Sequence, residues 1–351
     1  MKFIHIADVH LGACPDAGRA YTKNRGEEIW NTFERIIQVC EDEKADLLLI
    51  AGDLFHRQPL LRELKEVDYL FSKLTHTKVV LIAGNHDYLK PDSYYRKYRW
   101  ASQVYFLLDD TWDYIEFPEF ETSVYGLRYT SKEITEPLYD FAFPQKMQPI
   151  EILLAHGGDE KHIPIHKNQL LKLGYDYIAL GHIHRMQEVE KNKIVYAGSM
   201  EPTDKNDIGP HGYFIGEITK ERADVYFVPF AIRTYIHMEI PVTEMMTKRE
   251  IKDCVAEEIS KRGTMNCYKI ILTGFCDQDM ELSLEELDVY GNILEVQNLT
   301  RAAYDFEKIQ RANAGNLSGK YIESLKDAEK NSVEYMALFE GVEALLGSKR
   351  G

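Results

Sequence analysis

The first 230 residues alternate short apolar runs with amphipathic stretches, and this pattern restricts the fold more than any other feature. Residues 47–51 and 79–83 are apolar runs of strand length, whereas residues 27–42 place apolar side chains on one helical face. Strands that alternate with helices form a sheet covered by helices, so the pattern predicts an α/β domain. We expect strands at 3–7, 46–51, 78–83, 150–155, 175–180, 194–197, 213–218 and 224–229, and helices at 27–42 and 61–74.

A polar motif follows five of these apolar runs. The motifs are Asp8-Val9-His10, Gly52-Asp53, Gly84-Asn85-His86-Asp87, Ala155-His156-Gly157 and Gly181-His182-Ile183-His184. Open α/β sheets bind ligands at the carboxyl ends of their strands, so these side chains should converge at one edge. Asp, Asn and His suit divalent manganese, iron or zinc better than magnesium. The motifs therefore predict a centre for two metal ions, which is suited to attack on a phosphate ester.

In this order the motifs resemble the shared signature of the calcineurin-like metallophosphoesterases, from about residue 1 to residue 230. The resemblance implies an α/β fold with four layers, an α/β/β/α sandwich. It also implies two divalent metal ions as cofactors, with Mn²⁺ expected and iron or zinc as alternatives. The implied ligands are Asp8, His10 and His184 for the first ion, Asn85, His156 and His182 for the second, and Asp53 as the bridge between them.

Three further residues of these segments are candidates for catalysis or substrate binding. In the family, the histidine that stands where His86 does donates a proton to the leaving oxygen or stabilises the transition state, and an imidazole is suited to both roles. Asp87 either orients the His86 ring through its carboxylate or is a turn residue. His56 stands where related nucleases have a histidine near the scissile phosphate, so it is either a substrate contact or a structural histidine.

The residues around the motifs resemble those of SbcD-type exonucleases, which are bacterial relatives of the double-strand-break repair nuclease. The matching segments are 3–12, 52–56, 177–185, 196–202 and 211–214. The resemblance implies a nuclease domain over 1–232, a small α+β capping domain over 235–300 that contacts DNA, and a linker with a C-terminal helical segment over 301–351. It also implies that this segment docks on an SbcC-type coiled-coil ATPase, and that helices of the nuclease domain pair two subunits in a homodimer.

Within the C-terminal region we expect a linker at 315–319, followed by one final helix with apolar side chains from Ile322 to Leu346 on one face. That face either packs on its own domain or docks on a partner.

The net charge of −15 bears on the substrate, because it repels polyanions at long range. Residues 270–300 contain no Lys or Arg, so this stretch is a poor candidate for touching DNA. A DNA substrate requires a local basic strip, bound cations or a partner. Candidates for such a strip are Arg19, Lys23, Arg25, Arg57, Arg96, Lys97 and Arg99.

Two rival functions follow from these observations. A stand-alone phosphodiesterase or phosphatase for small substrates would account for the acidic charge. A scaffold that kept the fold but lost the chemistry is the other rival, and the presence of all seven implied ligands and of His86 argues against it.

The five cysteines form no CxxC pair, which is typical of free thiols in a reducing cytoplasm. The longest apolar runs are too short to cross a membrane, and residues 1–12 do not resemble a secretory signal. We therefore expect a cytoplasmic protein that makes no membrane contact.

Overall fold

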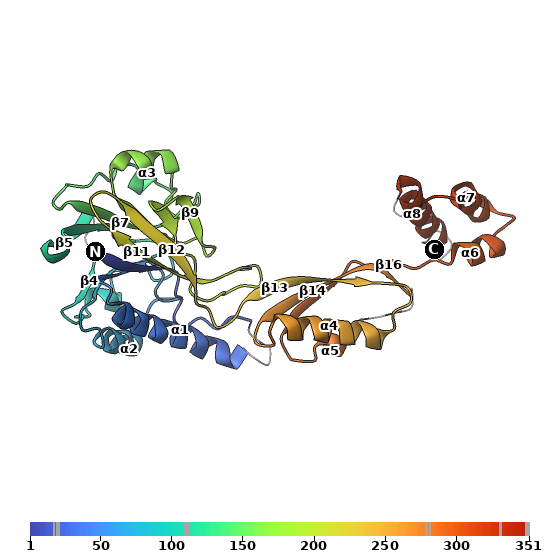
Figure 1. The fold of residues 1–351 in the computed structure, drawn as a ribbon, viewed down its shortest axis with the longest axis horizontal. Coiled ribbons are helices and arrows are strands. Elements are labelled where there is room, and N and C mark those ends of the chain that lie inside the picture. The colour runs from blue at the N-terminus through green and yellow to red at the C-terminus, as the bar shows by residue number, and fades with distance from the viewer. Residues whose placement is uncertain are drawn as a thin grey trace. The chain divides into compact units, whose positions relative to one another are not determined.

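The computed structural model describes residues 1–16, 18, 22–108, 112–277, 280, 282–329 and 332–347 (Figure 1). The chain divides into two compact units. We call them the N-terminal unit (Met1–Met238, Glu258–Lys269 and Asp288–Glu295) and the C-terminal unit (Glu239–Glu257, Ile270–Leu287 and Val296–Gly351).

The first sheet of the N-terminal unit is mostly parallel. Its strands are β1 (Lys2–Ile6), β2 (Leu47–Ala51), β3 (Lys78–Ile82), β4 (Val104–Phe106), β11 (Gly212–Ile218) and β12 (Ala223–Pro229). They lie in the order β12-β11-β1-β2-β3-β4. Strands β1 to β4 run parallel, and β11 and β12 are antiparallel to their neighbours. The carboxyl ends of β1, β2 and β3 therefore meet at one edge.

The second sheet of this unit repeats the arrangement. Its strands are β5 (Trp112–Phe117), β6 (Thr122–Leu127), β7 (Ile150–His156), β8 (Tyr177–Gly181), β9 (Gln187–Glu190) and β10 (Ile194–Tyr196). They lie in the order β5-β6-β7-β8-β10-β9, with β6, β7, β8 and β10 parallel. Strands β7 and β8 thus bring their carboxyl ends together as well.

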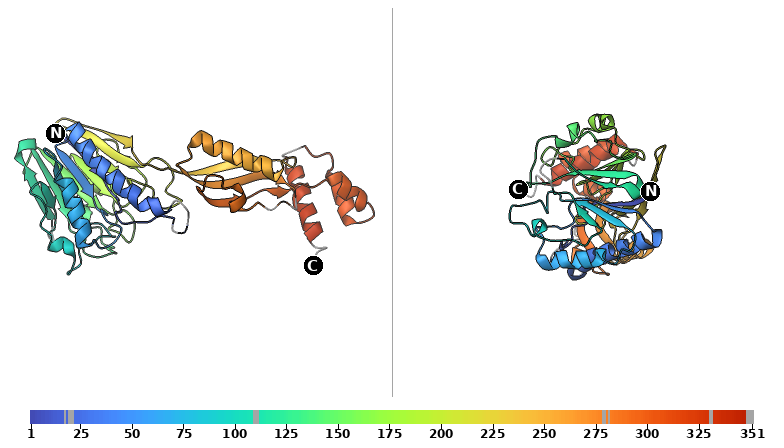
Figure 2. Two further views of the ribbon diagram at one scale, coloured as in Figure 1. Left: turned by 90° about the horizontal axis from the view of Figure 1, so that it is seen from below. Right: turned by 90° about the vertical axis from the view of Figure 1, so that its left-hand side faces the viewer.

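Helices cover the outer faces of both sheets. Helices α1 (Thr22–Glu43) and α2 (Leu61–Phe71) lie on one side, and α3 (Lys167–Leu173) lies on the other (Figure 1). The right-hand view of Figure 2 shows the same order, with both sheets between the helices. Three short 3₁₀ helices occur at Tyr94–Arg96, Pro118–Phe120 and Leu138–Phe141. The predicted α/β/β/α sandwich is confirmed.

Two apolar clusters hold these layers together, because side chains alternate between the faces of each strand. One cluster lies between the sheets and includes Phe3, Leu47, Leu49, Val80, Ile152, Leu154 and Tyr177. The other joins the outer faces to the helices and includes Ile4, Leu48, Ile50, Phe33, Ile36, Leu153, Ile178 and Leu170. Both faces of the central strands are buried, so little movement is available to the residues that follow them.

A third sheet follows these two along the chain. Strands β13 (Tyr235–Val242), β14 (Cys267–Cys276) and β15 (Ile293–Asn298) lie in that order, and β16 (Arg301–Ala302) pairs with β14. Helix α4 (Lys248–Arg262) connects β13 to β14, and helix α5 (Leu284–Leu287) lies between β14 and β15 in the chain. The predicted domain boundaries at 232 and 300 remain predictions.

The C-terminal region differs from its prediction in two respects. It contains α6 (Phe306–Ala312), α7 (Leu317–Leu325) and α8 (Val333–Gly347). The linker predicted at 315–319 is wrong, because the Asn316 side chain accepts hydrogen bonds from the backbone of Ser318 and Gly319 and so starts α7. The single final helix is also wrong. Ile322 of α7 packs on Leu338 and Val342 of α8, so the apolar face predicted for one helix is divided between two.

The strands predicted in the first 230 residues are all present, with bounds that differ by one or two residues. The prediction missed β4, β5, β6 and β9. Among the described residues, no helix is long and apolar enough to cross a membrane.

Candidate metal centre

The structure brings the seven predicted ligands together from five strand ends. Asp8 and His10 follow β1, Asp53 follows β2 and Asn85 follows β3, whereas His156 ends β7 and His182 and His184 follow β8. Five of them are buried, and His182 and His184 are partly exposed. Both sheets therefore contribute ligands to one edge, as the motif positions predict.

The backbone at this edge is strained. Asp8, His10, Asp53 and His182 have positive φ angles of 50°, 53°, 50° and 99°, which residues with a side chain rarely adopt. Each such residue costs about 1–3 kcal/mol and persists only where its surroundings hold it. Here the Asp8 N–H donates to Gly52 O (3.2 Å), and the His10 N–H donates to Asp53 O (3.1 Å). Four of the ten non-glycine residues with positive φ in the described part of the chain are thus predicted ligands.

Two glycines of the motifs permit close approach of the ligands. A Cβ on Gly52 would overlap the His156 ring, and a Cβ on Gly84 would overlap the Asp53 carboxylate. Any other residue at these positions would push a predicted ligand away.

The donor atoms form two groups. In the first, ligand atoms of Asp8, His10 and His184 lie within 4.8 Å of one another, and the two histidine Nε2 atoms are 3.0 Å apart. In the second, Asn85 Oδ1 lies 2.9 Å from His156 Nε2 and 3.0 Å from His182 Nδ1. Asp53 Oδ2 is 3.5 Å from His156 Nε2. The donor set fits two divalent ions, because imidazole nitrogens, carboxylate oxygens and the Asn85 amide oxygen converge at short range.

The electrostatics of the cluster also favour a cation. Burial opposes protonation of His156, but the adjacent Asp53 and Asp8 carboxylates outweigh burial and raise the pKa of His156 to about 9. Burial would likewise raise the pKa of Asp53, but its histidine neighbours, His156 first, hold that pKa well below its usual range. Burial raises the pKa of the Asp8 carboxyl. The Asp53 carboxylate of this buried site attracts positive charge, which a divalent ion supplies.

The outer nitrogens of three predicted ligands are hydrogen-bonded. His156 Nδ1 donates to Ala51 O (2.8 Å), His184 Nδ1 contacts Asp207 Oδ2 (3.1 Å), and His182 Nε2 contacts Asp159 Oδ2 (2.8 Å). Sequence reasoning missed Asp159 and Asp207. Both lie in loops outside the motifs, and the only signal in the sequence was that Asp159 comes shortly after His156.

His86 and His56 lie beside the cluster. The His86 N–H donates to Asp53 Oδ1 (2.8 Å), and its ring Nδ1 donates to His56 O (3.0 Å). The His86 ring centroid is 4.8 Å from that of His10 and 5.0 Å from that of His56. His86 is partly exposed and His56 is exposed. Both imidazoles are therefore placed to meet a substrate that binds to the ligand cluster.

Asp87 does not orient His86 in the predicted way. Its buried carboxylate accepts hydrogen bonds from Gly84 N (2.8 Å), Phe55 N (3.1 Å) and Tyr95 Oη (2.9 Å), and the His86 ring instead donates to a backbone carbonyl. Desolvation and the nearby Asp53 charge raise the pKa of Asp87 to about 6. Asp87 thus connects the loops that follow β2 and β3. This arrangement agrees with the second role considered for Asp87, that of a turn residue.

Only some side chains of the predicted basic strip are exposed and so able to contact DNA. Arg25 is buried, with Nη1 2.6 Å from Glu28 Oε2 and Nη2 donating to Pro202 O (2.7 Å). Arg57 pairs with Glu63 at 2.7 Å. The three that remain are exposed: Arg96, Lys97 and Arg99. Arg19 and the side chain of Lys23 lie outside the described residues.

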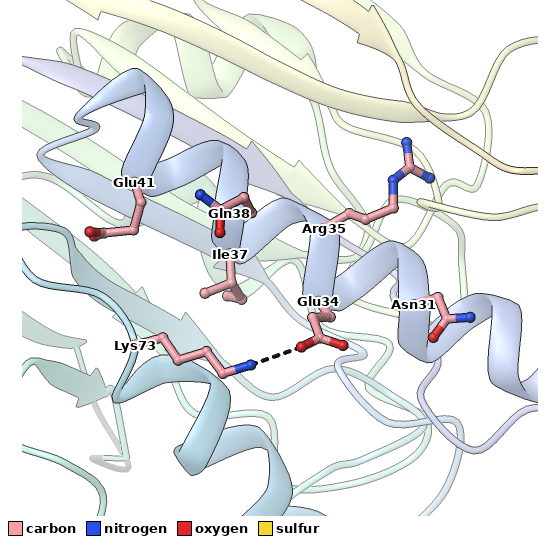
Figure 3. A pocket seen from close by; sticks show the side chains of 7 residues that line it. All are labelled: Asn31, Glu34, Arg35, Ile37, Gln38, Glu41 and Lys73. Carbon is pink, nitrogen blue, oxygen red and sulfur yellow. Dashed lines mark hydrogen bonds and ion pairs between the residues drawn. The ribbon is translucent and has the colours of Figure 1, made fainter.

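A separate surface hollow lies beside α1, and its lining side chains come from α1 and from Lys73, just after α2 (Figure 3). Lys73 Nζ pairs there with Glu34 Oε1 at 2.8 Å. The hollow contains none of the predicted ligands, so the candidate site is the cluster at the strand ends.

The chain is similar to known proteins over most of its length. A family model described as calcineurin-like phosphoesterase matches residues 1–186. The chain is 24% identical to the uncharacterized metallophosphoesterase YhaO of Bacillus subtilis, over 98% of this chain and 90% of the relative. It is 28% identical to the DNA double-strand break repair protein Mre11 of Methanocaldococcus jannaschii, over 85% of this chain and 90% of the relative. It is 25% identical to a subunit of the nuclease SbcCD of Staphylococcus epidermidis, over 85% of this chain and 86% of the relative.

Proposed function

Because the chain belongs to the calcineurin-like phosphoesterase family, we propose that this phosphoester hydrolase is a DNA exo/endonuclease subunit that acts in DNA repair. The observation that carries the proposal is its similarity, over 85% of its length, to relatives named as a double-strand break repair protein and a nuclease subunit. The exposed position of His56 beside the ligand cluster supports it, since an open site admits a phosphodiester within a long chain.

In this proposal two metal ions, Mn²⁺ first among the candidates, are held by the seven predicted ligands. Asp8, His10 and His184 would hold one ion, Asn85, His156 and His182 would hold the other, and Asp53 would be a ligand of both. When bound, the ions polarise the phosphoryl group and lower the pKa of the attacking water. No protein base is then needed, which leaves the neighbouring side chains free for the leaving group.

His86 assists the departing oxygen. Its Nδ1–H donates to the His56 carbonyl, so the opposite ring nitrogen, Nε2, is available to the substrate. When both ring nitrogens carry a proton, Nε2–H donates a proton or a hydrogen bond to the leaving oxygen, and the ring keeps the proton on Nδ1. Asp87 supports the ring indirectly, because it holds the loop on which His86 stands.

His56 contacts the scissile phosphate in this proposal, and Arg96, Lys97 and Arg99 contact the DNA backbone. These three exposed cations follow the loop that carries His86. Each phosphate contact releases counterions, so affinity should fall steeply with salt. Charge reversal at Arg96 and Lys97 should therefore weaken DNA binding without changing hydrolysis of a small diester.

The competing function is hydrolysis of a small phosphoester by a stand-alone enzyme. The net charge of −15 favours it, because polyanions are repelled at long range. A DNA nuclease with this charge relies on its local cations, on the metal ions or on a partner.

We further propose the domain boundaries at 232 and 300, docking of the C-terminal helices on an SbcC-type ATPase, and a homodimer formed by helices of the nuclease domain. The relative named as part of the SbcCD nuclease supports the ATPase partner. Analytical ultracentrifugation of the protein, alone and with such an ATPase, would test both assemblies. A sedimentation coefficient that stays that of a monomer in both cases would contradict them.

The decisive experiment supplies the purified protein and Mn²⁺ with linear duplex DNA, single-stranded DNA and bis(p-nitrophenyl) phosphate. We expect cleavage of DNA and of the small diester, and loss of both activities in the His86→Ala variant. If the protein cleaves only the small diester, with His86 still essential, the phosphodiesterase function replaces this proposal. The variant doubles as a control for a contaminating nuclease, whose activity would not depend on His86.

A further inference from the structure

Two aspartates outside the predicted ligand set lie directly behind the two histidines of the last motif. Asp207 Oδ2 is 3.1 Å from His184 Nδ1, and Asp159 Oδ2 is 2.8 Å from His182 Nε2. The aspartates thus contact different nitrogens of the two rings. A carboxylate accepts hydrogen bonds only, so the contacted nitrogen must carry the proton.

The remaining nitrogens face the metal centre. His184 Nε2 is 3.0 Å from His10 Nε2, and His182 Nδ1 is 3.0 Å from Asn85 Oδ1. The two rings therefore present opposite nitrogens to the centre, although only one residue separates them in the sequence. The partner of the outer nitrogen sets which nitrogen is free to bind a metal.

We propose that Asp207 and Asp159 are positioning residues that fix opposite tautomers, so that His184 binds its metal ion through Nε2 and His182 binds the other through Nδ1. The inference rests on the proposed ligand set. It assigns a role to two loops that carry no recognisable motif.

Asp207 is held in place by its own loop. Its Oδ2 accepts hydrogen bonds from Thr203 N (3.0 Å), Thr203 Oγ1 (3.0 Å) and Asp204 N (3.1 Å), and its backbone carbonyl accepts one from His211 Nε2 (2.9 Å). Thr203 Oγ1 also lies 3.2 Å from His184 Nδ1. The Thr203 hydroxyl can donate its own proton to Asp207. Thr203 Oγ1 and Asp207 Oδ2 can therefore both accept the single proton on His184 Nδ1. His211 is buried, so the loop that presents Asp207 is anchored in the fold.

Asp159 is held by a shorter and more exposed loop. Its side chain is 48% exposed, against 17% for Asp207. Asp159 accepts hydrogen bonds from Lys161 N (2.8 Å) and His162 N (3.0 Å), and His162 Nδ1 lies 2.9 Å from both of its oxygens. Solvent competes for an exposed carboxylate, so removal of Asp159 should weaken metal binding less than removal of Asp207.

The test combines metal titration with nuclear magnetic resonance of protein labelled with ¹⁵N in histidine only. Long-range ¹H–¹⁵N correlations of the Zn²⁺-loaded protein, which is diamagnetic, report which ring nitrogen carries the proton. We expect Nδ1–H on His184 and Nε2–H on His182 in the wild-type protein. Asp207→Ala should change the tautomer of His184 but not that of His182, and Asp159→Ala should change the tautomer of His182 but not that of His184.

Titration of Mn²⁺ by calorimetry should show a loss of about 10–100-fold in the affinity of one ion in each variant, with Asp207→Ala toward the larger value. Asp207→Asn and Asp159→Asn keep an oxygen acceptor and should recover the wild-type tautomer in part. Asp46→Ala is the matched control, because it removes another histidine–aspartate pair (His76 Nε2 to Asp46 Oδ1, 2.9 Å) just before β2, at the end of that strand opposite the site. It should leave both affinities unchanged.

The possible failures are distinguishable. If zinc does not shift the His184 and His182 signals of the wild-type protein, the proposed ligand set fails. If the wild-type protein binds zinc through both rings but the alanine variants keep their tautomers and affinities, the positioning role is overturned. Loss of one bound ion in Asp159→Ala with an unchanged His182 tautomer would also overturn it, because Asp159 would then be a ligand.

Discussion

The two units of the chain place their polar side chains in opposite ways. In the N-terminal unit, Asp8, His10, Asp53 and His156 are buried at the ends of strands that are themselves buried on both faces. In the C-terminal unit, Ser318 is the only buried polar residue within the described part of the chain, and the interior is made of side chains such as Ile270 and Leu338. Burial of polar groups costs free energy unless they are paired, so the N-terminal unit retains an arrangement that stability alone disfavours.

The candidate metal ligands thus lie in the N-terminal unit, whereas the C-terminal unit is held together by apolar packing. A site made of buried carboxylates and strained backbone persists because the two sheets around it are rigid. Helices α6, α7 and α8 pack mainly through apolar contacts, which suits a recognition or structural role. The comparison predicts that variants of the two units will fail in different measurements.

The largest effect should come from Asp53→Asn, which removes the charge that lies between the two groups of ligands. Metal ions contribute several kcal/mol to the transition state, so turnover should fall about 10³-fold or more. Mn²⁺ titration should show that binding of both ions is weakened. The variant still accepts the His86 N–H through its amide oxygen, so the loop should keep its position. Full metal binding by this variant would contradict the bridging role.

A smaller loss is expected for His86→Ala. The ring contacts a backbone carbonyl and lies beside the ligands, so both ions should still bind while turnover falls about 10²–10⁴-fold. Steady-state hydrolysis of the small diester, combined with Mn²⁺ titration, measures both properties. His166→Ala removes an exposed histidine that pairs with Asp140 and should leave turnover unchanged. Normal turnover in His86→Ala would eliminate its assistance to the leaving group.

The sequence predicted most central strands of the N-terminal unit because they are apolar runs buried on both faces. Strand β6 is also buried throughout but was missed, because Thr122, Ser123 and Gly126 interrupt its apolar run. Residues 47–51 are all apolar and all buried, and a strand of this kind is evident from its composition. Strands β5 and β9 were missed because they lie at the edges of the second sheet and carry exposed charged residues such as Glu116 and Glu188. Edge strands resemble loops in composition.

Some residues of the candidate site could likewise be predicted from the sequence, and others could not. The seven predicted ligands and His86 lie in motifs at fixed positions after strands, so the sequence could indicate them. The contacts of Asp207 and Asp159 depend on how loops fold back in space, and Asp207 is 23 residues away from the histidine it contacts. Neither periodicity nor spacing encodes such a contact. The sequence left two roles open for Asp87 for the same reason, since its partners Phe55 and Tyr95 come from other segments.

Mn²⁺ should stabilise the N-terminal unit and leave the C-terminal helices unchanged. A ligand that binds only the folded state stabilises it by about 2.7 kcal/mol at a concentration of about 100 times its dissociation constant. Hydrogen exchange followed by mass spectrometry should show slower exchange after β1, β2 and β8 when Mn²⁺ is added, and restored exchange with EDTA. Equal protection of α7 and α8 would contradict the separation of the two units.

The smallest effect on chemistry should come from Leu338→Ala, although its effect on local stability is large. Leu338 of α8 is 3% exposed and packs on Ile322 of α7, so truncation should cost about 2–5 kcal/mol and increase hydrogen exchange in both helices. Leu317→Ala is the matched control, because that leucine is 69% exposed on α7 and its loss should cost at most about 0.5 kcal/mol. Hydrolysis of the small diester and Mn²⁺ affinity should match the wild-type values in both variants. If Leu338→Ala lowered either value, packing in the C-terminal unit would support the metal centre, and the division between the two units would not hold. If only DNA cleavage fell, the C-terminal helices would contribute to the substrate or to its partner, and the division would become sharper.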